Sequence, residues 1–176
     1  MFHPAWIEAI ATQYDYPGEP QIIADGNRAR SRGYYAYEDF VRLSRWKTRG
    51  RSIRHLATTS ASELETATRV ALDPRTSERR RARVLVALDG IEYPVASCVL
   101  HFAHADPYPI LDRRALESLG YKTQRTIYSE TFWQDYVAAC RDLALRQAIT
   151  MRVLDRALCT WPALRDRDRY RVPPAK

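Results

Sequence analysis

Lysine is scarce in this sequence, because only Lys47, Lys122 and Lys176 are lysines among its 28 lysine and arginine residues. The chain has 21 acidic residues, so arginine carries almost all of its formal net charge of +7. The planar guanidinium group of arginine binds phosphate at two points and stacks on bases. The charge therefore favours nucleic acid as a partner over small acidic metabolites. The alternative is a basic surface without a specific partner.

Two further features are missing from the sequence. Its three cysteines, Cys98, Cys140 and Cys159, have no C-x-x-C spacing, which predicts neither disulfides nor a cysteine-based metal site. No run approaches the roughly 20 apolar residues of a membrane span, and the first residues lack the charged-then-apolar order of a signal peptide. We therefore expect a cytoplasmic protein without a membrane segment, and no motif requires a metal or cofactor.

No segment shows the period-two alternation of a strand, and the sequence predicts an all-α fold. A chain of 176 residues with 45% hydrophobic residues suits one compact, monomeric domain. We expect an N-terminal helix and loop (1–35), a helical core (37–120), C-terminal helices (129–161) and a frayed tail (165–176). Helices are expected over 4–14, 37–47, 77–88, 94–102, 113–119, from residue 130 to about residue 144, and 151–161.

Local signals refine these boundaries. The Pro- and Gly-rich stretch 16–33 has few apolar residues and is typical of a loop. Ser62 and Glu65 suggest a capping box that opens a helix ending at Asp73. Asp112 stands where an N-cap is expected, after the Pro-rich turn 106–109.

The segment 88–96 predicts a helical hairpin, with two helices joined by a turn at Gly90 and the second helix beginning at Pro94. The lone carboxylate of Asp112 follows eighteen residues after Pro94. A tight hairpin can offer backbone N–H groups to a DNA phosphate, while the next helix carries the chain to a reactive side chain.

On these residues the chain resembles the helix-hairpin-helix superfamily of base-excision repair DNA glycosylases. Their hairpin pattern is Leu-Pro-Gly-Val-Gly-x-Lys-Thr-Ala, followed after an apolar helix by a Pro/Val-Asp element. Leu88, Gly90, Ile91 and Ala96 match the hairpin, and the residues 109–112 resemble the second element.

The resemblance implies DNA binding by the hairpin residues Gly90 and Ile91, with Asp112 as the catalytic carboxylate that activates water or stabilises a cationic sugar. Glu92 replaces the second hairpin glycine, which weakens the DNA-gripping role of this turn. Pro94 stands where lyase-competent members carry their Schiff-base lysine, so strand cleavage is not expected. The alternative role of Asp112 is that of a helix cap alone.

Six cations and no acid occur between residues 42 and 54, around Trp46. On analogy with the family, this segment would lie where an extruded base leaves the duplex. The predicted DNA-binding residues are Trp46, Lys47, Arg49, Arg51 and Arg54, in which Trp46 stacks on a base and the cations hold phosphates. The alternative is a core tryptophan beside a solvated basic face.

Other polar clusters favour structural roles. The run Arg79, Arg80, Arg81 and Arg83 is typical of a charged outer helix face. His101 and His104 have a spacing compatible with metal binding but no third ligand, which favours structural histidines. Asp155 and Arg156 are expected to form a buried or semi-buried ion pair that fixes the last helix, and the alternative is a role in the cleft.

The leading hypothesis is a hydrolase of the DNA glycosylase type that binds double-stranded DNA and hydrolyses an N-glycosidic bond without lyase action. A second hypothesis is a non-catalytic DNA-binding module with the same fold. A third is a protein-interaction module whose contact elements are the N-terminal region and the Arg/Asp tail.

Overall fold

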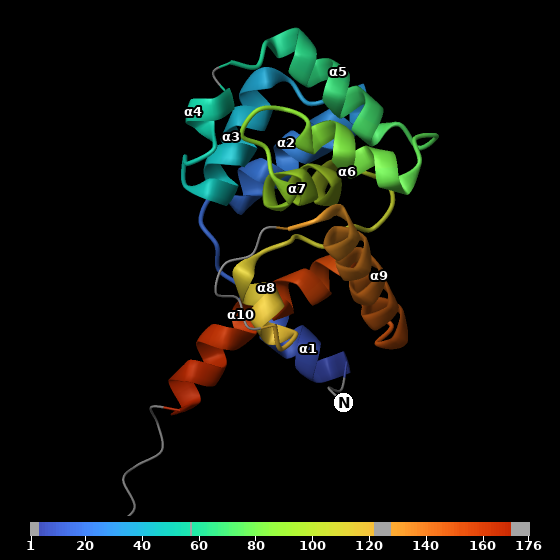
Figure 1. Ribbon diagram of the computed structural model, residues 1–176. Coiled ribbons are helices and arrows are strands. Elements are labelled where there is room, and N and C mark those ends of the chain that lie inside the picture. Colours follow the sequence, from blue (N-terminus) through green and yellow to red (C-terminus); the bar gives the residue numbers. More distant parts are fainter. Residues whose placement is uncertain (1–3, 57, 122–127, 170–176) are drawn as a thin grey trace, which may run out of the picture.

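The protein is described by a computed structural model that covers residues 4–56, 58–121 and 128–169. These residues form helices and connecting segments without a strand, as the sequence predicts (Figure 1). The helices are α1 (Pro4–Ala11), α2 (Glu19–Arg32), α3 (Tyr37–Thr48), α4 (Ile53–Leu56), α5 (Ala61–Leu72), α6 (Glu78–Val86), α7 (Tyr93–Ala103), α8 (Arg113–Ser118), α9 (Glu130–Arg146) and α10 (Met151–Arg169). None of these described helices is both long and apolar enough to cross a bilayer.

The predicted cap of α8 is confirmed, and α9 begins with a cap of the same kind. The side chain of Asp112 accepts a hydrogen bond from the backbone N–H of Ala115, and that of Ser129 accepts one from Phe132. Each bond satisfies an N–H group that the first helical turn leaves without an intrahelical partner. The expected apolar helix after the hairpin is α7, whose side chains are almost all buried.

The prediction of a loop over 16–33 is wrong, because α2 occupies most of this stretch. Gly18 adopts the left-handed conformation (φ 80°) just before the helix, and Pro20 lies in its first turn, where its missing N–H costs nothing. Gly26 permits close packing inside the helix, because a Cβ there would lie 2.6 Å from the Cβ of Phe102 on α7. Packing of helix against helix outweighs the low helix propensity of these residues.

Two helix boundaries also differ from the prediction. The N-cap of α5 is Ser60, which accepts a hydrogen bond from the N–H of Glu63, so the cap lies two residues before the expected Ser62. The last helix α10 continues to Arg169, beyond the expected end at residue 161, and includes the first part of the expected tail. Residues 170–176 of that tail lie outside the described part.

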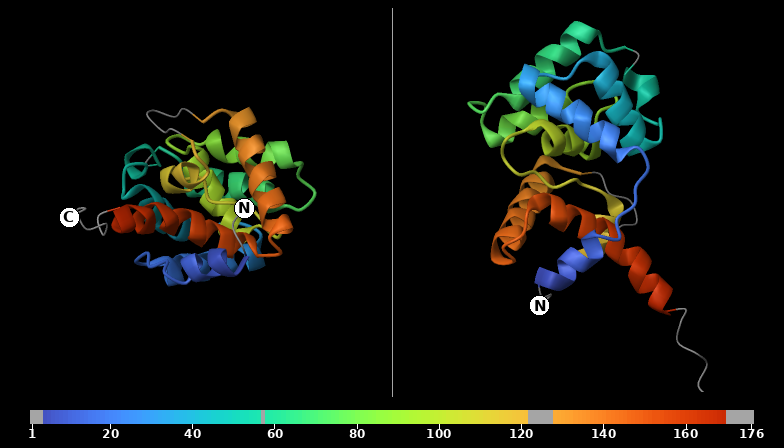
Figure 2. Two further views of the ribbon diagram at one scale, coloured as in Figure 1. Left: turned by 90° about the horizontal axis from the view of Figure 1, so that it is seen from below. Right: turned by 180° about the vertical axis from the view of Figure 1, so that it is seen from behind.

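The helices form an upper and a lower lobe (Figures 1 and 2). The upper lobe consists of α2–α7, in which α7 lies at the centre and contacts α2, α3, α5 and α6. The lower lobe consists of α1, α8, α9 and α10, in which α10 contacts the other three. The chain passes between the lobes through residues 12–18 and 104–112, so the lower lobe combines both end regions of the described chain.

Ion pairs join α6 of the upper lobe to α9 of the lower lobe. Arg79 Nε lies 2.7 Å from Glu130 Oε1, and Arg141 Nη1 lies 2.8 Å from Glu78 Oε2. Arg81 departs from the predicted charged outer face, since it is 5% exposed. Its guanidinium donates to Asp106 and to the hydroxyl of Tyr108, and thereby fixes the second connection between the lobes.

The expected ion pair between Asp155 and Arg156 is also wrong. Asp155 Oδ2 instead accepts a hydrogen bond from Arg152 at 2.7 Å, one turn earlier on α10. Arg156 binds Glu19 at the start of α2, at 2.7 Å. Because Glu19 belongs to the upper lobe, this contact is a second ionic connection between the lobes.

Candidate functional site

A cleft of about 860 Å³ lies between the two lobes. Its volume falls within the roughly 300–1,000 Å³ that is typical of small-molecule sites. Several short segments line it: Tyr14 and Tyr16, residues 46–49, 51 and 52 at the end of α3, His55 on α4, the hairpin residues Gly90, Glu92, Pro94 and Val95, residues 110–114, Tyr128, and Asp155 with Cys159 on α10. We refer to this space as the cleft.

Asp112 lies in the cleft wall, where α8 begins, and its two carboxylate oxygens have different surroundings. Oδ1 accepts the capping hydrogen bond from the N–H of Ala115 at 2.8 Å. Oδ2 lies 3.7 Å from Nζ of Lys47, and the side chain is 28% exposed. One oxygen thus fixes the orientation of the carboxylate, and the other is free for contact with a ligand. The cap and a chemical role are compatible in this geometry.

The segment before Asp112 is held from three sides. The N–H of Ile110 donates to Asp155 on α10, and its carbonyl oxygen accepts from the hydroxyl of Tyr136 on α9. The N–H of Leu111 donates to the hydroxyl of Ser97 on α7 at 3.0 Å. Burial raises the pKa of Asp155, against the opposing effects of His101 and Arg152. These bonds leave the backbone that carries Asp112 little freedom to move.

Lys47 lies inside the cleft rather than on its rim. Its side chain is 10% exposed, although the sequence predicted a phosphate contact for it. Burial by itself lowers the pKa of Lys47, but nearby acidic groups, including Cys98 and Asp112, raise it above its usual value. At neutral pH Lys47 therefore carries an ammonium group in the cleft, 3.7 Å from Oδ2 of Asp112.

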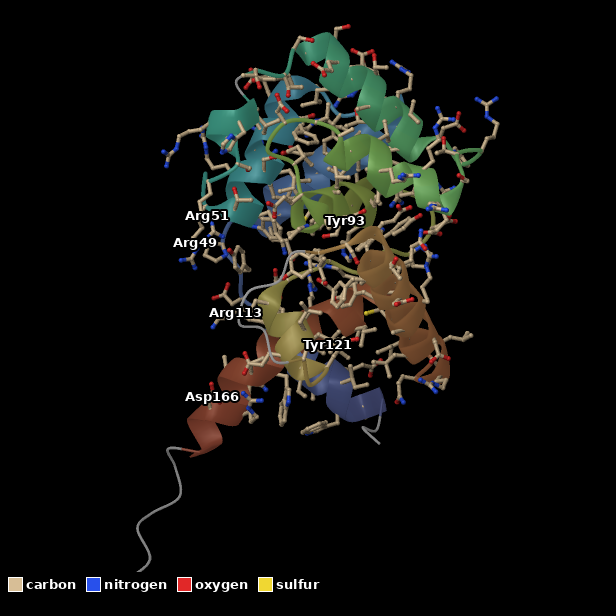
Figure 3. All side chains as sticks on the ribbon, in the orientation of Figure 1. Arg49, Arg51, Tyr93, Arg113, Tyr121 and Asp166 are labelled. Atoms are coloured by element: carbon tan, nitrogen blue, oxygen red, sulfur yellow. The ribbon has the colours of Figure 1, made fainter. Side chains whose placement is uncertain are left out.

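Four arginines line the cleft from both lobes. Arg49 and Arg51 belong to the upper lobe, and Arg113 and Arg114 belong to α8 in the lower lobe. Figure 3 shows Arg49, Arg51 and Arg113 at the same edge of the molecule, on opposite sides of the gap between the lobes. None of the four pairs with a carboxylate in the described part of the chain, whereas most other described arginines do.

Arg49 has an unusual backbone conformation. It ends α3 with a φ of 54°, and Gly50 follows at 87°. A non-glycine residue in this left-handed region costs roughly 1 kcal/mol or more. The conformation turns the chain so that Arg49 and Arg51 both reach the cleft.

Aromatic rings form one wall of the cleft. The ring of Trp46 contacts Tyr16 edge-on, with centroids 5.1 Å apart, and Tyr14 stacks beside Tyr16 at 6.3 Å. The indole N–H of Trp46 donates to the carbonyl oxygen of Pro17. Trp46 also packs on Phe102 of the core. Trp46 is therefore partly buried against the core and also lines the cleft.

The hairpin turn is packed against α4. Gly90 has a φ of 73°, and a Cβ there would lie 2.2 Å from the Cβ of His55. Gly90 lines the cleft, but the side chain of Ile91 is 3% exposed and belongs to the core. Arg54 is exposed on α4 and lies outside the cleft lining.

The histidines and cysteines have structural surroundings. Nδ1 of His101 lies 2.6 Å from the carbonyl oxygen of Tyr108, and Nδ1 of His104 accepts from the N–H of Asp106. Among the described residues, no cluster of three or more His, Cys, Asp or Glu side chains could hold a metal ion. The three cysteines are free and buried, and burial raises the pKa of the Cys159 thiol to about 12.

Sequence reasoning did not identify Tyr14, Tyr16, Arg113 or Arg114 as site residues. Tyr14 is the last residue of the first predicted helix and Tyr16 the first residue of the predicted loop, and the arginines follow the predicted catalytic residue directly. The Arg113-Arg114 pair next to Asp112 is the signal that could have been used. Comparisons with protein-family models, with curated proteins and with solved structures found no match for this chain.

Proposed function

We propose that this protein binds DNA across the cleft and hydrolyses the N-glycosidic bond of a nucleotide that has been rotated out of the duplex. The observation that carries the proposal is the position of Asp112, which is rigidly held and partly exposed in the cleft, between unpaired arginines of both lobes. The resemblance to the helix-hairpin-helix glycosylases, through residues 88–112, supports the same assignment.

The chemistry follows from the charge that develops during bond cleavage. When the bond between sugar and base breaks, positive charge accumulates on the sugar. A fixed carboxylate stabilises this charge more than it stabilises the neutral substrate, and this difference lowers the barrier. Oδ2 of Asp112 is the oxygen available for this purpose, because Oδ1 is bound to Ala115.

The cleft suits an extruded nucleotide. The aromatic wall of Tyr14, Tyr16 and Trp46 can stack on a base, and base–aromatic stacking contributes about 1–3 kcal/mol per base. The arginines at the rim can hold the phosphates on either side. Pro94 has no amine at the hairpin position where lyase-competent family members have one, so we propose hydrolysis without strand cleavage.

The decisive experiment is the release of free base from duplexes that carry deaminated, oxidised or alkylated bases. We expect release by the wild-type protein and a loss of at least about 100-fold in Asp112→Asn, because asparagine keeps the cap but removes the charge. Arg54→Ala is the matched control, since Arg54 is an exposed arginine outside the cleft lining. Equal release by wild type and Asp112→Asn would refute the proposal, as would no release from the whole panel.

A second candidate function is DNA binding without chemistry. The basic residues of the cleft favour it, because Arg49, Arg51 and Arg113 line the cleft from both lobes and pair with no carboxylate in the described part of the chain. Glu92 also lines the cleft, and its negative charge points to the arginines rather than the hairpin as the phosphate contacts. This function predicts that duplex affinity falls steeply as the salt concentration rises. In a plot of the logarithm of the binding constant against the logarithm of the salt concentration, each phosphate contact contributes about −0.9 to the slope. Replacement of Arg49 and Arg113 together should weaken binding, and Asp112→Asn should strengthen it by removing a repulsive charge.

A further inference from the structure

Lys47 differs from the other cations of the described chain. Of the three lysines, it alone lies within the described residues, and it occupies the cleft beside Asp112. A guanidinium group keeps its protons at every accessible pH, whereas an ammonium group can give one up. The one described lysine of the cleft can therefore donate a proton to a ligand, which an arginine at the same position could not do.

The ammonium group of Lys47 has donors available for a ligand. An ammonium group has three N–H donors. Its nearest carboxylate oxygen, Asp112 Oδ2, lies 3.7 Å away, which is too far for a hydrogen bond. No other described residue accepts a hydrogen bond from Lys47. The ammonium group thus lines the cleft with Asp112 as its ionic partner, and it has no hydrogen-bond acceptor among the described residues.

The two charges match the two ends of a breaking glycosidic bond. As the bond lengthens, the sugar becomes positive and the departing base becomes negative. The cleft presents a carboxylate and an ammonium group side by side, so each charge can face the end of opposite sign. A single carboxylate would stabilise only the sugar.

We propose that Lys47 is a second catalytic residue, which donates a proton to the departing base while Asp112 stabilises the sugar cation. This inference rests on the proposed function. The C1′–N bond breaks with its electron pair on the base nitrogen, and the base takes the proton of Lys47. Water adds to C1′ and loses a proton, which restores the ammonium group. The net reaction consumes one water and yields a free base and an abasic sugar.

The protonation state of Lys47 agrees with this role. A proton donor must begin the reaction in its protonated form. Acidic neighbours, including Cys98 and Asp112, raise the pKa of Lys47 despite its burial, so the ammonium form dominates at neutral pH. The same raised pKa makes Lys47 a poor nucleophile, which disfavours a Schiff base at this position.

The test compares two leaving groups within each variant. The release rate is measured under single-turnover conditions for two substrates. One carries the base that the panel shows to be released, and the other carries the same base with a fluorine on its ring. The fluorinated base departs more easily without a proton. Lys47→Met should lower the release rate of the parent base by about 100-fold or more, and that of the fluorinated base by a factor roughly tenfold smaller. Lys47→Arg should recover little, because arginine keeps the charge but cannot donate the proton. Arg80→Met removes an exposed cation of α6 that lies outside the cleft lining, and it should keep the wild-type release rates on both substrates.

Each outcome has a distinct meaning. An equal loss on both substrates in Lys47→Met would show that Lys47 only positions Asp112, and would overturn the inference while base release by the wild type stands. Full activity of Lys47→Arg would overturn proton donation in the same way. No release by the wild type would overturn the proposed function and this inference together. If circular dichroism shows that Lys47→Met is unfolded, the Lys47→Arg result decides alone.

Discussion

The hairpin turn offers a sharp test of the packing described above. Substitution of Gly90 by alanine adds a Cβ that meets the Cβ of His55 at 2.2 Å and the carbonyl oxygen of Ser52 at 3.3 Å. The φ of 73° adds a backbone cost of about 1–2 kcal/mol for any residue with a side chain. Overpacking adds about 1–3 kcal/mol. We therefore expect Gly90→Ala to lower the free energy of unfolding by about 2–5 kcal/mol.

A double-mutant cycle separates these two costs. His55→Ala removes the Cγ at 3.0 Å but keeps the Cβ at 2.2 Å, so it should give little relief, whereas His55→Gly removes both atoms. In the His55→Gly background, Gly90→Ala should cost only the backbone part of about 1–2 kcal/mol. Urea denaturation monitored by circular dichroism measures all four free energies. Equal costs of Gly90→Ala in the wild-type and His55→Gly backgrounds would refute the close approach of the hairpin to α4.

Three further predictions concern Asp112, Arg49 and His104. Asp112→Ala should be less stable than Asp112→Asn by about 1 kcal/mol, because asparagine keeps the cap whereas both variants leave Lys47 without its carboxylate. This difference corresponds to about 2–4 °C in the melting temperature. Equal melting temperatures would contradict the cap. Arg49→Gly should match or exceed the wild type in stability, because glycine accepts the positive φ, while duplex affinity falls and the log–log salt slope becomes shallower by about 1. Unchanged DNA binding would remove Arg49 from the interface. The pKa of His104 is lowered, first by burial and then by Arg81, so the unfolded chain takes up this proton at higher pH than the folded one. Its contribution to stability is therefore complete above about pH 6.5 and is lost as the pH falls below that value. Between pH 7.5 and 5.5 the wild type should lose more unfolding free energy than His104→Asn, and parallel losses would contradict the shift.

Helix positions were largely predictable where an apolar period and a cap coincide. The long helix after Ser129 is such a case, and the cap at Asp112 was found from its place after the prolines. Residues 37–47 and 94–102 were predicted without a cap, from their apolar residues and, in the second case, from Pro94. The helix α2 was missed because its stability comes from packing against α7, which Gly26 permits and which no local pattern reveals. The cap of α5 was misplaced because two serines, Ser60 and Ser62, precede the same apolar residues, and either could begin the helix.

The sequence predicted some of the residues that line the cleft, but only partly how their side chains are placed. The sequence identified Asp112 and the segment around Trp46, and the structure brings both to one cleft. It could not show that Lys47 points inward while Arg49 and Arg51 stay exposed, because neighbouring residues on a helix end differ in burial through tertiary contacts alone. The contact of Arg156 with Glu19 joins residues 137 positions apart, beyond the reach of any local rule.

The pairing of α1 with α10 bears on the order of events during biosynthesis. The first helix leaves the ribosome long before its partner is translated, whereas α2–α7 are contiguous and can fold as they emerge. The upper wall of the cleft can thus exist in a nascent chain, while the lower wall, with α8 and α10, closes only once α10 has been made. A ribosome-bound intermediate would carry Arg49 and Arg51 already in place, but would have no partner for Lys47.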